Sequence, residues 1–167
     1  QHGLVLLDKH GEVLRPAKLW CDVESAPENR QLLHWLGGEA GSLERLGLVI
    51  APGYTVSKLL WTKIHHPQVF AQIAHILLPH DYLNYWLTGR CCTEYGDASG
   101  TGYFNVRTRQ WDLDLLRHID PEGRLERALP ELIGSEQPVG TLRPDVARLL
   151  GLNPGAMVSS GGGDNMM

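Results

Sequence analysis

The sequence predicts an α/β fold, and three observations carry that prediction. Segments whose apolar residues recur every three or four positions, as in helices, alternate with short apolar runs typical of buried strands. Hydrophobic residues make up 43% of the chain and charged residues 20%, a balance that supplies a packed core and argues against disorder. The 167 residues suit one compact domain and are few for two. Helices mixed with short strands in one domain indicate the α/β class.

The first element is predicted to be a β-hairpin. The apolar run 4–7 precedes a turn signal at His10-Gly11, after which the apolar pattern resumes at residues 13–14. A third run, 17–21, is consistent with a strand that leads to Asp22. Three later segments are also predicted to be strands, namely 76–78, 103–106 and 156–160.

Helices are predicted where helical periodicity meets a start or stop signal. Ser25 and Glu28 form a capping box with Pro27 near the first helical position, so a helix is expected from there to Gly37. The other predicted helices are 42–46, 55–64, 68–74, 81–87, 112–119 and 143–150. Residues 129–140 contain several turn formers and are predicted to be mostly loop, whereas residues 93–101 are small and polar.

Charge and cysteine content disfavour several classes of function. The net charge of −4 and the pI near 6.0 disfavour a broad nucleic-acid or anionic-membrane surface. No apolar run approaches the roughly 20 residues that a membrane span needs. Three cysteines argue against a disulfide scaffold and favour a cytoplasmic protein. The chain begins at Gln1 without Met and ends just after a glycine-rich strand exit, so we expect an internal piece of a longer protein.

Common catalytic and metal-binding motifs are missing from the sequence. It contains no GxSxG nucleophile elbow, no GxxxxGK[ST] phosphate loop, no HExxH pair and no Cys/His set with zinc spacing. The eight histidines are therefore expected to face solvent or to cap helices, and no metal site is predicted. Cys91 and Cys92 are neighbours, an arrangement that suits neither a bridge nor a shared ligand set.

Asp164 and Trp20 are the candidates for chemistry, and each has an ordinary alternative. Asp164 follows a predicted strand and three glycines, and the carboxyl ends of strands are where α/β proteins place reactive groups. Its alternative role is a helix N-cap. Asn165 beside it could hydrogen-bond a hydroxyl. Trp20 lies near a strand end, where its flat face could wall a sugar pocket or simply pack in the core.

At these residues the chain resembles the FGGY carbohydrate kinases, and within them the xylulokinases. The matching segments occur in the family's order and cover essentially the whole chain. They are Gln1-His2-Gly3, Leu19-Trp20-Cys21-Asp22, Pro52-Gly53-Tyr54-Thr55, Lys58-Leu59-Leu60-Trp61, Leu78-Pro79-His80-Asp81-Tyr82-Leu83, Leu87-Thr88-Gly89, Asp97-Ala98-Ser99-Gly100-Thr101 and Gly161-Gly162-Gly163-Asp164-Asn165. Each segment alone is weak, but their joint order and spacing make the match specific.

The resemblance implies part of a ribonuclease-H-like, actin-type domain. Residues 1–167 would form a partial N-terminal, sugar-binding kinase domain, without the family's opening strands and without its C-terminal domain. Those missing strands would hold the metal- and phosphate-binding groups, and the missing domain most of the adenine site. The resemblance therefore implies ATP and Mg²⁺ as cofactors whose sites lie largely outside this chain, which alone is expected to be inactive.

The resemblance also implies roles for particular residues. Asp164 matches the general base that takes the proton of the sugar hydroxyl, and Asn165 would hold another hydroxyl. His2 matches the substrate-contacting histidine of xylulokinases, and Trp20 matches a tryptophan that walls the pocket. Glycerol kinases have Arg-Glu where this chain has Gln1-His2, which favours a ketopentose as substrate.

The function implied is ATP-dependent phosphorylation of D-xylulose to D-xylulose 5-phosphate. Another pentulose or hexulose kinase of the family is the first alternative, and a non-catalytic sugar-binding domain of the same fold is the second. The expected partners are a small sugar and the remainder of a parent chain, with no nucleic acid and no membrane. A homodimer is left open.

Overall fold

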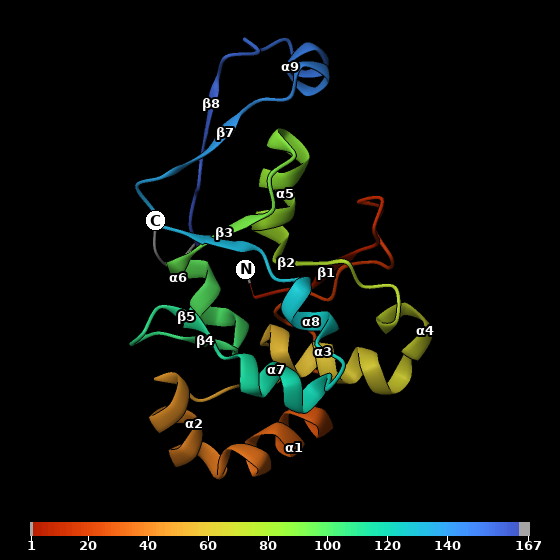
Figure 1. The fold of residues 1–167 in the computed structure, drawn as a ribbon, viewed down its shortest axis with the longest axis vertical. Helices are drawn as coiled ribbons and strands as arrows, with labels where there is room; N and C mark the ends of the chain where they lie inside the picture. Colours follow the sequence, from red (N-terminus) through yellow and green to blue (C-terminus); the bar gives the residue numbers. More distant parts are fainter. Residues whose placement is uncertain (1, 164–167) are drawn as a thin grey trace.

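The computed structural model describes residues 2–163. They fold into short strands and helices that follow one another along an elongated molecule (Figure 1). The elements are β1 (Val5–Leu7), α1 (Ala26–Leu36), α2 (Gly38–Leu46), α3 (Thr55–His65), α4 (Pro67–Phe70), β2 (His75–Leu77), α5 (Pro79–Thr88), β3 (Cys92–Glu94), α6 (Tyr95–Ala98), the 3₁₀ helix η1 (Ser99–Thr101), β4 (Phe104–Asn105), β5 (Gln110–Trp111), α7 (Leu113–Ile119), α8 (Arg124–Arg127), β6 (Glu131–Ile133), β7 (Pro138–Thr141), α9 (Pro144–Leu150) and β8 (Met157–Ser159).

The strands form two-stranded pairs rather than one continuous sheet among the described residues. β1 and β2 pair antiparallel, as do β4 with β5 and β7 with β8. β3 and β6 pair in parallel, with Thr93 opposite Leu132, and the connection between them passes through α6, α7 and α8. A parallel pair with a helical crossover is the signature of the predicted α/β class.

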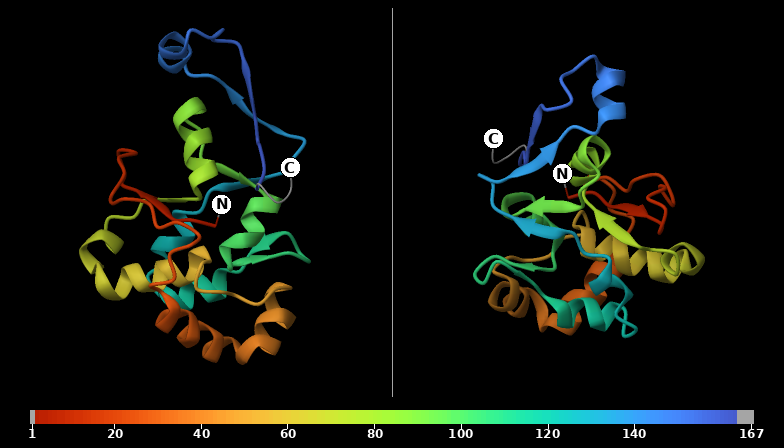
Figure 2. Two further views of the ribbon diagram at one scale, coloured as in Figure 1. Left: turned by 180° about the vertical axis from the view of Figure 1, so that it is seen from behind. Right: turned by 45° about the horizontal axis from the view of Figure 1, so that its top comes forward.

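β1 is buried on both faces, which explains its unbroken apolar run. Leu4 and Leu6 point into the main core beside residues of α1, α3 and α7. Val5 and Leu7 point the other way, where Leu77 and the aromatic rings of α5 cover them. Successive side chains on a strand alternate between its faces, so one short strand joins the two cores. The ribbon views of Figure 2 show β1 between α5 on one side and α3 on the other.

The predicted N-terminal hairpin is confirmed in its turn and only partly in its strands. Residues 8–11 turn the chain, with Gly11 at φ +81°, and the amide of Leu14 donates to the carbonyl of Leu6 at 2.9 Å. The predicted strand 17–21 is wrong, because only Lys18 pairs with Leu4. The Lys18 ammonium then bonds Asp22 at 2.7 Å and lies over an aromatic ring, and these side-chain contacts favour a turn over further pairing.

Most predicted helices are confirmed, with differences at their ends. Four helices are followed by glycines in left-handed backbone conformations, namely the expected Gly37 and also Gly47, Gly89 and Gly151. The predicted capping box is wrong, because the Ser25 hydroxyl donates instead to the carbonyl of Pro52 at 3.0 Å. Helix α2 begins earlier than expected, at Gly38, and α4 ends earlier, at Phe70.

The predicted loop 129–140 is wrong, since it contains β6 and the start of β7. Each of these strands is formed by pairing with a segment far away in the chain, β3 for one and β8 for the other. Turn-forming residues carry no information about such partners. Residues 93–101 likewise contain the end of β3, α6 and η1.

The N-terminus of α7 is held by Asp112. Its carboxylate accepts two bonds from Arg45, at 2.6 and 2.7 Å, and a third from the amide of Leu115 at 2.9 Å. Burial acts to raise the pKa of Asp112, but the Arg45 and Leu115 bonds outweigh it and hold the pKa below its usual value. The carboxylate therefore stabilises the fold at neutral pH, and the stabilisation is lost as the pH falls through this lowered pKa.

Asp112→Asn is expected to lower the free energy of unfolding at pH 7 by about 1–3 kcal/mol, because a charged, hydrogen-bonded cap is replaced by a neutral one. The deficit should shrink below about pH 4, where the unfolded carboxyl protonates. Urea unfolding at several pH values measures it. The control is Asp114→Asn, whose exposed side chain lies 3.4 Å from Arg45 and should cost less than about 0.5 kcal/mol. Equal losses for both variants would contradict the assignment.

No helix within residues 2–163 has the length and apolar character needed to cross a bilayer. The three cysteines, Cys21, Cys91 and Cys92, are all free thiols in the structure.

Candidate functional site

The two ends of the described chain lie on the same part of the molecule, near α6 (Figures 1 and 2). The imidazole of His2 lies directly against Gly100 of η1, where a Cβ atom would come within 1.5 Å of its Nδ1. At the other end, a Cβ at Gly161 would come within 2.7 Å of Nε2 of His80, a side chain that is bonded to Asp97 of α6. Two glycines therefore let two imidazoles lie against the backbone.

His2 is held by the start of α3. Its ring centroid lies 5.4 Å from that of Tyr54, and its backbone adopts φ +50°, which is uncommon for a residue other than glycine. The hydroxyl of Thr55 donates to the carbonyl of Gly3 at 3.2 Å, and the Lys58 ammonium lies 3.5 Å from the carbonyl of His2. These contacts fix an otherwise unfavourable backbone conformation at the position that the sequence predicted for sugar contact.

Lys58 is fully buried and binds backbone carbonyls. Its ammonium also donates to the carbonyl of Gly53, so it ties the loop before α3 to the segment that carries His2. Burial lowers the pKa of Lys58 to about 8, an effect that the nearby carboxylate of Asp22 opposes. With a pKa so close to neutral pH, the Lys58 amine can lose its charge more easily than an exposed lysine. Its role in the fold is to donate hydrogen bonds to the two carbonyls.

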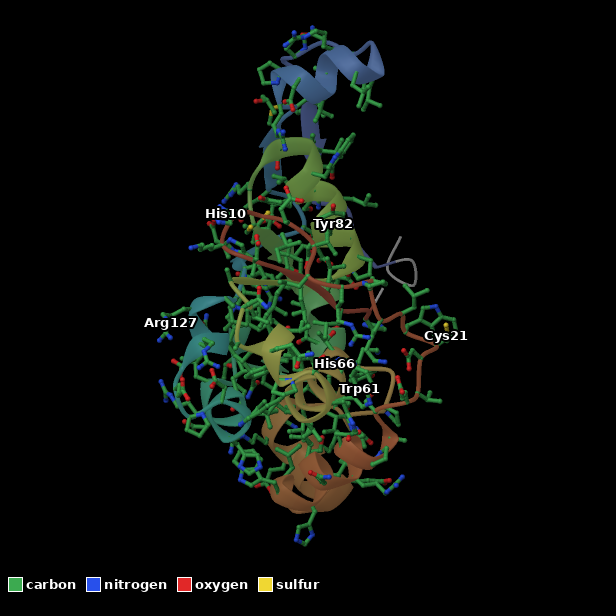
Figure 3. All side chains as sticks on the ribbon, turned by 90° about the vertical axis from the view of Figure 1, so that its right-hand side faces the viewer. His10, Cys21, Trp61, His66, Tyr82 and Arg127 are labelled. Atoms are coloured by element: carbon green, nitrogen blue, oxygen red, sulfur yellow. The ribbon has the colours of Figure 1, made fainter. Side chains whose placement is uncertain are left out.

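Trp20 lies on the surface, which overturns the interpretation of a core tryptophan. Its side chain is 63% exposed, and the neighbouring Cys21 is exposed at the edge of the molecule (Figure 3). The backbone of Trp20 lies against the loop at Gly53, where a Cβ would come within 2.5 Å of the Trp20 carbonyl oxygen. An exposed aromatic face beside this loop is available to a ligand.

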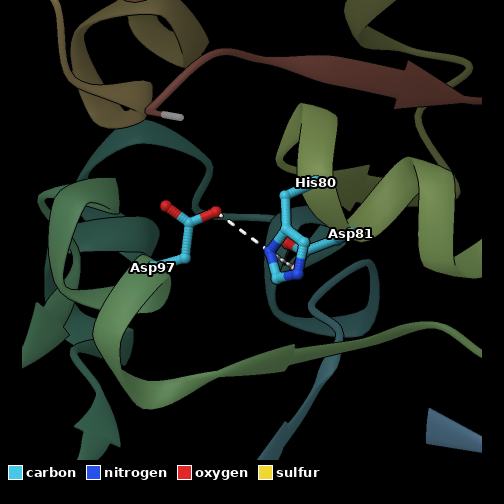
Figure 4. Close-up of side chains that lie close together, drawn as sticks. All are labelled: His80, Asp81 and Asp97. Atoms are coloured by element: carbon cyan, nitrogen blue, oxygen red, sulfur yellow. Dashed lines mark hydrogen bonds and ion pairs between the residues drawn. The ribbon is translucent and has the colours of Figure 1, made fainter. Parts of the chain in front are cut away.

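His80, Asp81 and Asp97 form a cluster between α5 and α6 in which both aspartates are buried and the histidine is partly buried (Figure 4). Nδ1 of His80 lies 3.2 Å from Oδ2 of Asp97 and 3.6 Å from Oδ1 of Asp81. Nε2 of the same ring lies 2.5 Å from the carbonyl oxygen of Ser160, at the end of β8. The other oxygen of Asp81 accepts the amide hydrogen of Leu78 at 3.0 Å and so fixes the start of α5.

Burial and mutual contact change the acidity of this cluster. The hydrogen bond to Asp97 raises the pKa of His80 above its usual value, while burial acts against the rise. Burial raises the pKa of Asp81 to about 7, opposed by the amide of Leu78 and by His80. His80 and Asp81 therefore both bind protons at a higher pH than exposed side chains of the same kinds would.

The same three residues are the only set of three possible metal ligands among residues 2–163, with ligand atoms within 4.8 Å of one another. Both ring nitrogens of His80 are already engaged, one by Asp97 and one by the Ser160 carbonyl. An imidazole whose two nitrogens face acceptors is a hydrogen-bond donor on both sides. The cluster is therefore assigned as an ion pair rather than as a metal centre.

An open pocket of about 440 Å³ adjoins the glycine segment. Gly161 and Gly162 line it together with Tyr95, Glu94 and Arg109. The Glu94 carboxylate caps α6 by accepting the amide hydrogens of residues 96 and 97, and the Arg109 guanidinium lies 5.3 Å from the ring centroid of Tyr95. The glycine segment thus borders an open space whose wall combines charged and aromatic side chains.

Two of the predicted site residues lie within the described part of the chain. His2, the first described residue, lies beside η1. Trp20 lies on the surface beside the loop that precedes α3. Gln1, Asp164 and Asn165 lie outside the described residues. The structure therefore brings the predicted substrate histidine to the region that the glycine segment enters, and it leaves the predicted base untested.

Sequence reasoning missed the most connected polar residues of the region. His80 was expected to face solvent or to cap a helix, yet its side chain is largely buried between two carboxylates. Asp97 lies in a segment that resembles the family, but its hydrogen-bond partner, His80, lies 17 residues away in the chain. Lys58 lies within a predicted helix and is fully buried, although lysine side chains are usually exposed. Helical spacing alone carries no signal for any of these contacts.

Comparison with known proteins identifies similar chains. The model of the FGGY family of carbohydrate kinases, N-terminal domain, matches residues 1–167. A protein from Haemophilus influenzae named xylulose kinase is 52% identical over 167 residues, which are 100% of this chain and 34% of that protein. A protein of the same name from Streptomyces rubiginosus is 42% identical over 165 residues, 99% of this chain and 33% of that one. The chain thus spans about a third of the length of these curated relatives.

Solved structures show the same fold. A structure described as a xyloylose kinase from Brucella ovis is 34% identical and superposes with a TM-score of 0.88 over 99% of this chain and 33% of that one. This likeness, together with the helices and paired strands described above, confirms the predicted fold class, an α/β chain that is part of a ribonuclease-H-like, actin-type domain.

Proposed function

The chain belongs to the FGGY family of carbohydrate kinases, and from this membership we propose that the whole protein, meaning this chain with whatever precedes or follows it, phosphorylates the 5-hydroxyl of D-xylulose with ATP. The observation that carries the proposal is the 52% identity, over every residue of the chain, with a relative named xylulose kinase. Another sugar specificity or a non-catalytic sugar-binding role is a competing outcome of the experiments below.

In the proposed reaction Asp164 is the general base. A sugar hydroxyl is a weak nucleophile, and a carboxylate within hydrogen-bond reach removes its proton as the phosphoryl group is transferred. The three preceding glycines allow the backbone to approach a ligand closely. The position of Asp164, directly after β8 and its glycines, supports this role.

His2, Gln1, Asn165 and Trp20 are proposed to bind the sugar. The polar side chains would pair with its hydroxyls, and the exposed Trp20 face would cover its C–H surface. The support from geometry is strongest for His2, whose ring is fixed by the space at Gly100 and by Tyr54.

ATP and Mg²⁺ are proposed to bind mainly through parts of the protein outside this chain. When bound, Mg²⁺ would neutralise charge on the phosphates of ATP. Within residues 2–163, the one candidate set of ligands is occupied by its own hydrogen bonds and does not fit the ion.

His2→Ala is expected to raise the Kd for D-xylulose by about 10- to 100-fold, because the variant lacks the imidazole that would hydrogen-bond a sugar hydroxyl. The Kd for ATP should change by less than about threefold. Isothermal titration calorimetry on the whole protein measures both constants.

Gly100→Ala tests the same site without a substitution of His2 itself. The added methyl group overlaps the imidazole, so the ring must move and sugar affinity should fall similarly. The matched control is His10→Ala, which removes an exposed imidazole from the hairpin turn and should leave both constants unchanged. Equal losses of sugar and ATP affinity in the His2 variant would contradict its role in sugar selection.

A further inference from the structure

Two side chains of α5 converge on one carbonyl at the end of β8. Nε2 of His80 lies 2.5 Å from the carbonyl oxygen of Ser160, and Nδ2 of Asn84 lies 2.9 Å from the same atom. The two donors are four residues apart and so lie on one face of the helix. The Ser160 hydroxyl donates in turn to the carbonyl of Ser135 at 3.0 Å. Ser160 is thereby held from two directions, at the last point before the glycines.

The segment that follows has little conformational preference of its own. Residues 161–163 are all glycine, and Gly161 adopts φ +69°, a conformation that few other residues accept. A glycine run loses more conformational freedom on ordering than any other sequence. The direction in which the chain leaves β8 therefore depends on the contacts at Ser160. The residue that follows Gly163 in the sequence is Asp164.

The hydrogen-bond partners of His80 require both of its ring nitrogens to carry hydrogen. A carbonyl oxygen only accepts, so the nitrogen facing Ser160 must donate. The other nitrogen faces the carboxylates of Asp97, at 3.2 Å, and Asp81, at 3.6 Å. An ionised carboxylate also only accepts, so the imidazolium is the form of the ring that donates both to Asp97 and to the Ser160 carbonyl. Nδ2 of Asn84, 3.2 Å from Nε2, donates to the same carbonyl and not to the ring in this arrangement.

The charged groups that face this ring come from two helices. Asp97 belongs to α6 and Asp81 to α5 itself. The uncharged groups facing the ring are the carbonyl of Ser160, directly after β8, and the amide of Asn84. No other cation contacts these carboxylates among the described residues. Two buried carboxyls beside one cationic ring favour its protonated form, in keeping with the raised pKa of His80.

We propose that His80 is a positioning residue: as an imidazolium oriented by Asp97, it holds the carbonyl of Ser160 and so sets the path of the glycine segment that leads to Asp164. When Nε2 of His80 loses its proton, the hydrogen bond to Ser160 is lost, and the nitrogen lone pair then faces a lone pair of the carbonyl oxygen. Asn84 is then the one remaining side-chain donor of α5 to this carbonyl, and we expect Asp164 to be placed less accurately against the sugar hydroxyl. This inference rests on the proposed function for its catalytic consequence but not for the protonation state of His80.

The first test is kinetic and uses the whole protein. His80→Gln is expected to lower kcat by about 10- to 100-fold, because a displacement of the base of about 1 Å has effects of that size. The KM values for D-xylulose and ATP should change by less than about threefold, since the proposal has His80 act through the Ser160 carbonyl and not by binding either ligand. His34→Gln, in an exposed imidazole at the end of α1, is the matched control and should leave kcat unchanged.

The pH dependence separates positioning from a merely structural role. In the unsubstituted protein kcat should fall on the alkaline side as His80 loses its proton. Asp97→Asn removes the carboxylate that favours the imidazolium, so this fall should move to lower pH by about one unit or more. His80→Lys, which keeps a cation to high pH, should restore part of kcat and abolish the alkaline fall. A loss of kcat in His80→Gln with none of these pH effects would overturn the proposal.

The second test does not depend on activity. Labelled histidine ring carbons are followed by NMR against pH, and the His80 signal is assigned by its absence from His80→Gln. The expected result is a pKa above 6.5 that falls in Asp97→Asn. A His80 ring that titrates at or below 6.5, or a bound divalent metal that His80→Gln loses, would overturn the inference. A protein that does not phosphorylate D-xylulose but gives the expected titration would contradict the proposed function alone.

Discussion

Asp164→Ala lowers kcat of the whole protein by about 100- to 10,000-fold if this carboxylate is the general base, since that is the range that general-base catalysis contributes. Binding of D-xylulose should stay within about threefold of the unsubstituted protein, because the base acts on the hydroxyl mainly as the phosphoryl group arrives. Steady-state kinetics with coupled detection of ADP gives kcat, and calorimetry gives sugar affinity.

The alternative role of Asp164, a helix N-cap, predicts a different pattern. Loss of a cap lowers stability by about 0.5–2 kcal/mol and leaves kcat nearly unchanged. Asp164→Asn, which keeps capping ability and removes the base, separates the two roles, because it should lose activity without losing stability. Asp145→Ala, on an exposed face of α9, is the matched control for removal of an aspartate. A kcat near the unsubstituted value in Asp164→Ala would remove the assignment.

The polypeptide 1–167 produced alone is expected to show no sugar-dependent release of ADP. Phosphoryl transfer depends on positioning and on charge stabilisation of the phosphates. The curated relatives are about three times longer than this chain. Residues 2–163 contain neither a glycine-rich phosphate loop nor a carboxylate set free to bind a metal. A general base alone cannot bring about phosphoryl transfer when no phosphate group is aligned with the sugar hydroxyl.

The measurement is a coupled assay with ATP, Mg²⁺ and D-xylulose on polypeptide free of host kinases, beside the whole protein as positive control. Circular dichroism on the same sample shows whether the polypeptide is folded. Sustained turnover that Asp164→Ala abolishes would show that these 167 residues contain all the catalytic parts.

Local signals predicted the helices well, because their determinants lie within the helices themselves. The apolar face of α3 and the stop glycine after α5 are readable in the sequence and are present in the structure. β6 and β7 were missed because each is stabilised by a partner strand distant in the chain. A segment rich in turn formers becomes a strand when such a partner is available.

The candidate site divides in the same way. His2 and Trp20 were predicted from a resemblance of short segments, and the structure supplies their surroundings. The cluster of His80 with Asp97 could not be predicted, because the bond joins residues 17 apart and the Ser160 contact spans 80 positions. Only the folded chain brings these groups together, and burial then gives them properties that isolated side chains lack.

The contact between His2 and Gly100 also constrains the order in which these positions can change during evolution or laboratory selection. A side chain at position 100 is sterically incompatible with the present placement of the imidazole. A substitution there is tolerated only after the residue at position 2 has become smaller, whereas position 2 can shrink first. Libraries that vary the two positions separately will therefore miss combinations that a paired library recovers, since contacting residues are strongly non-additive.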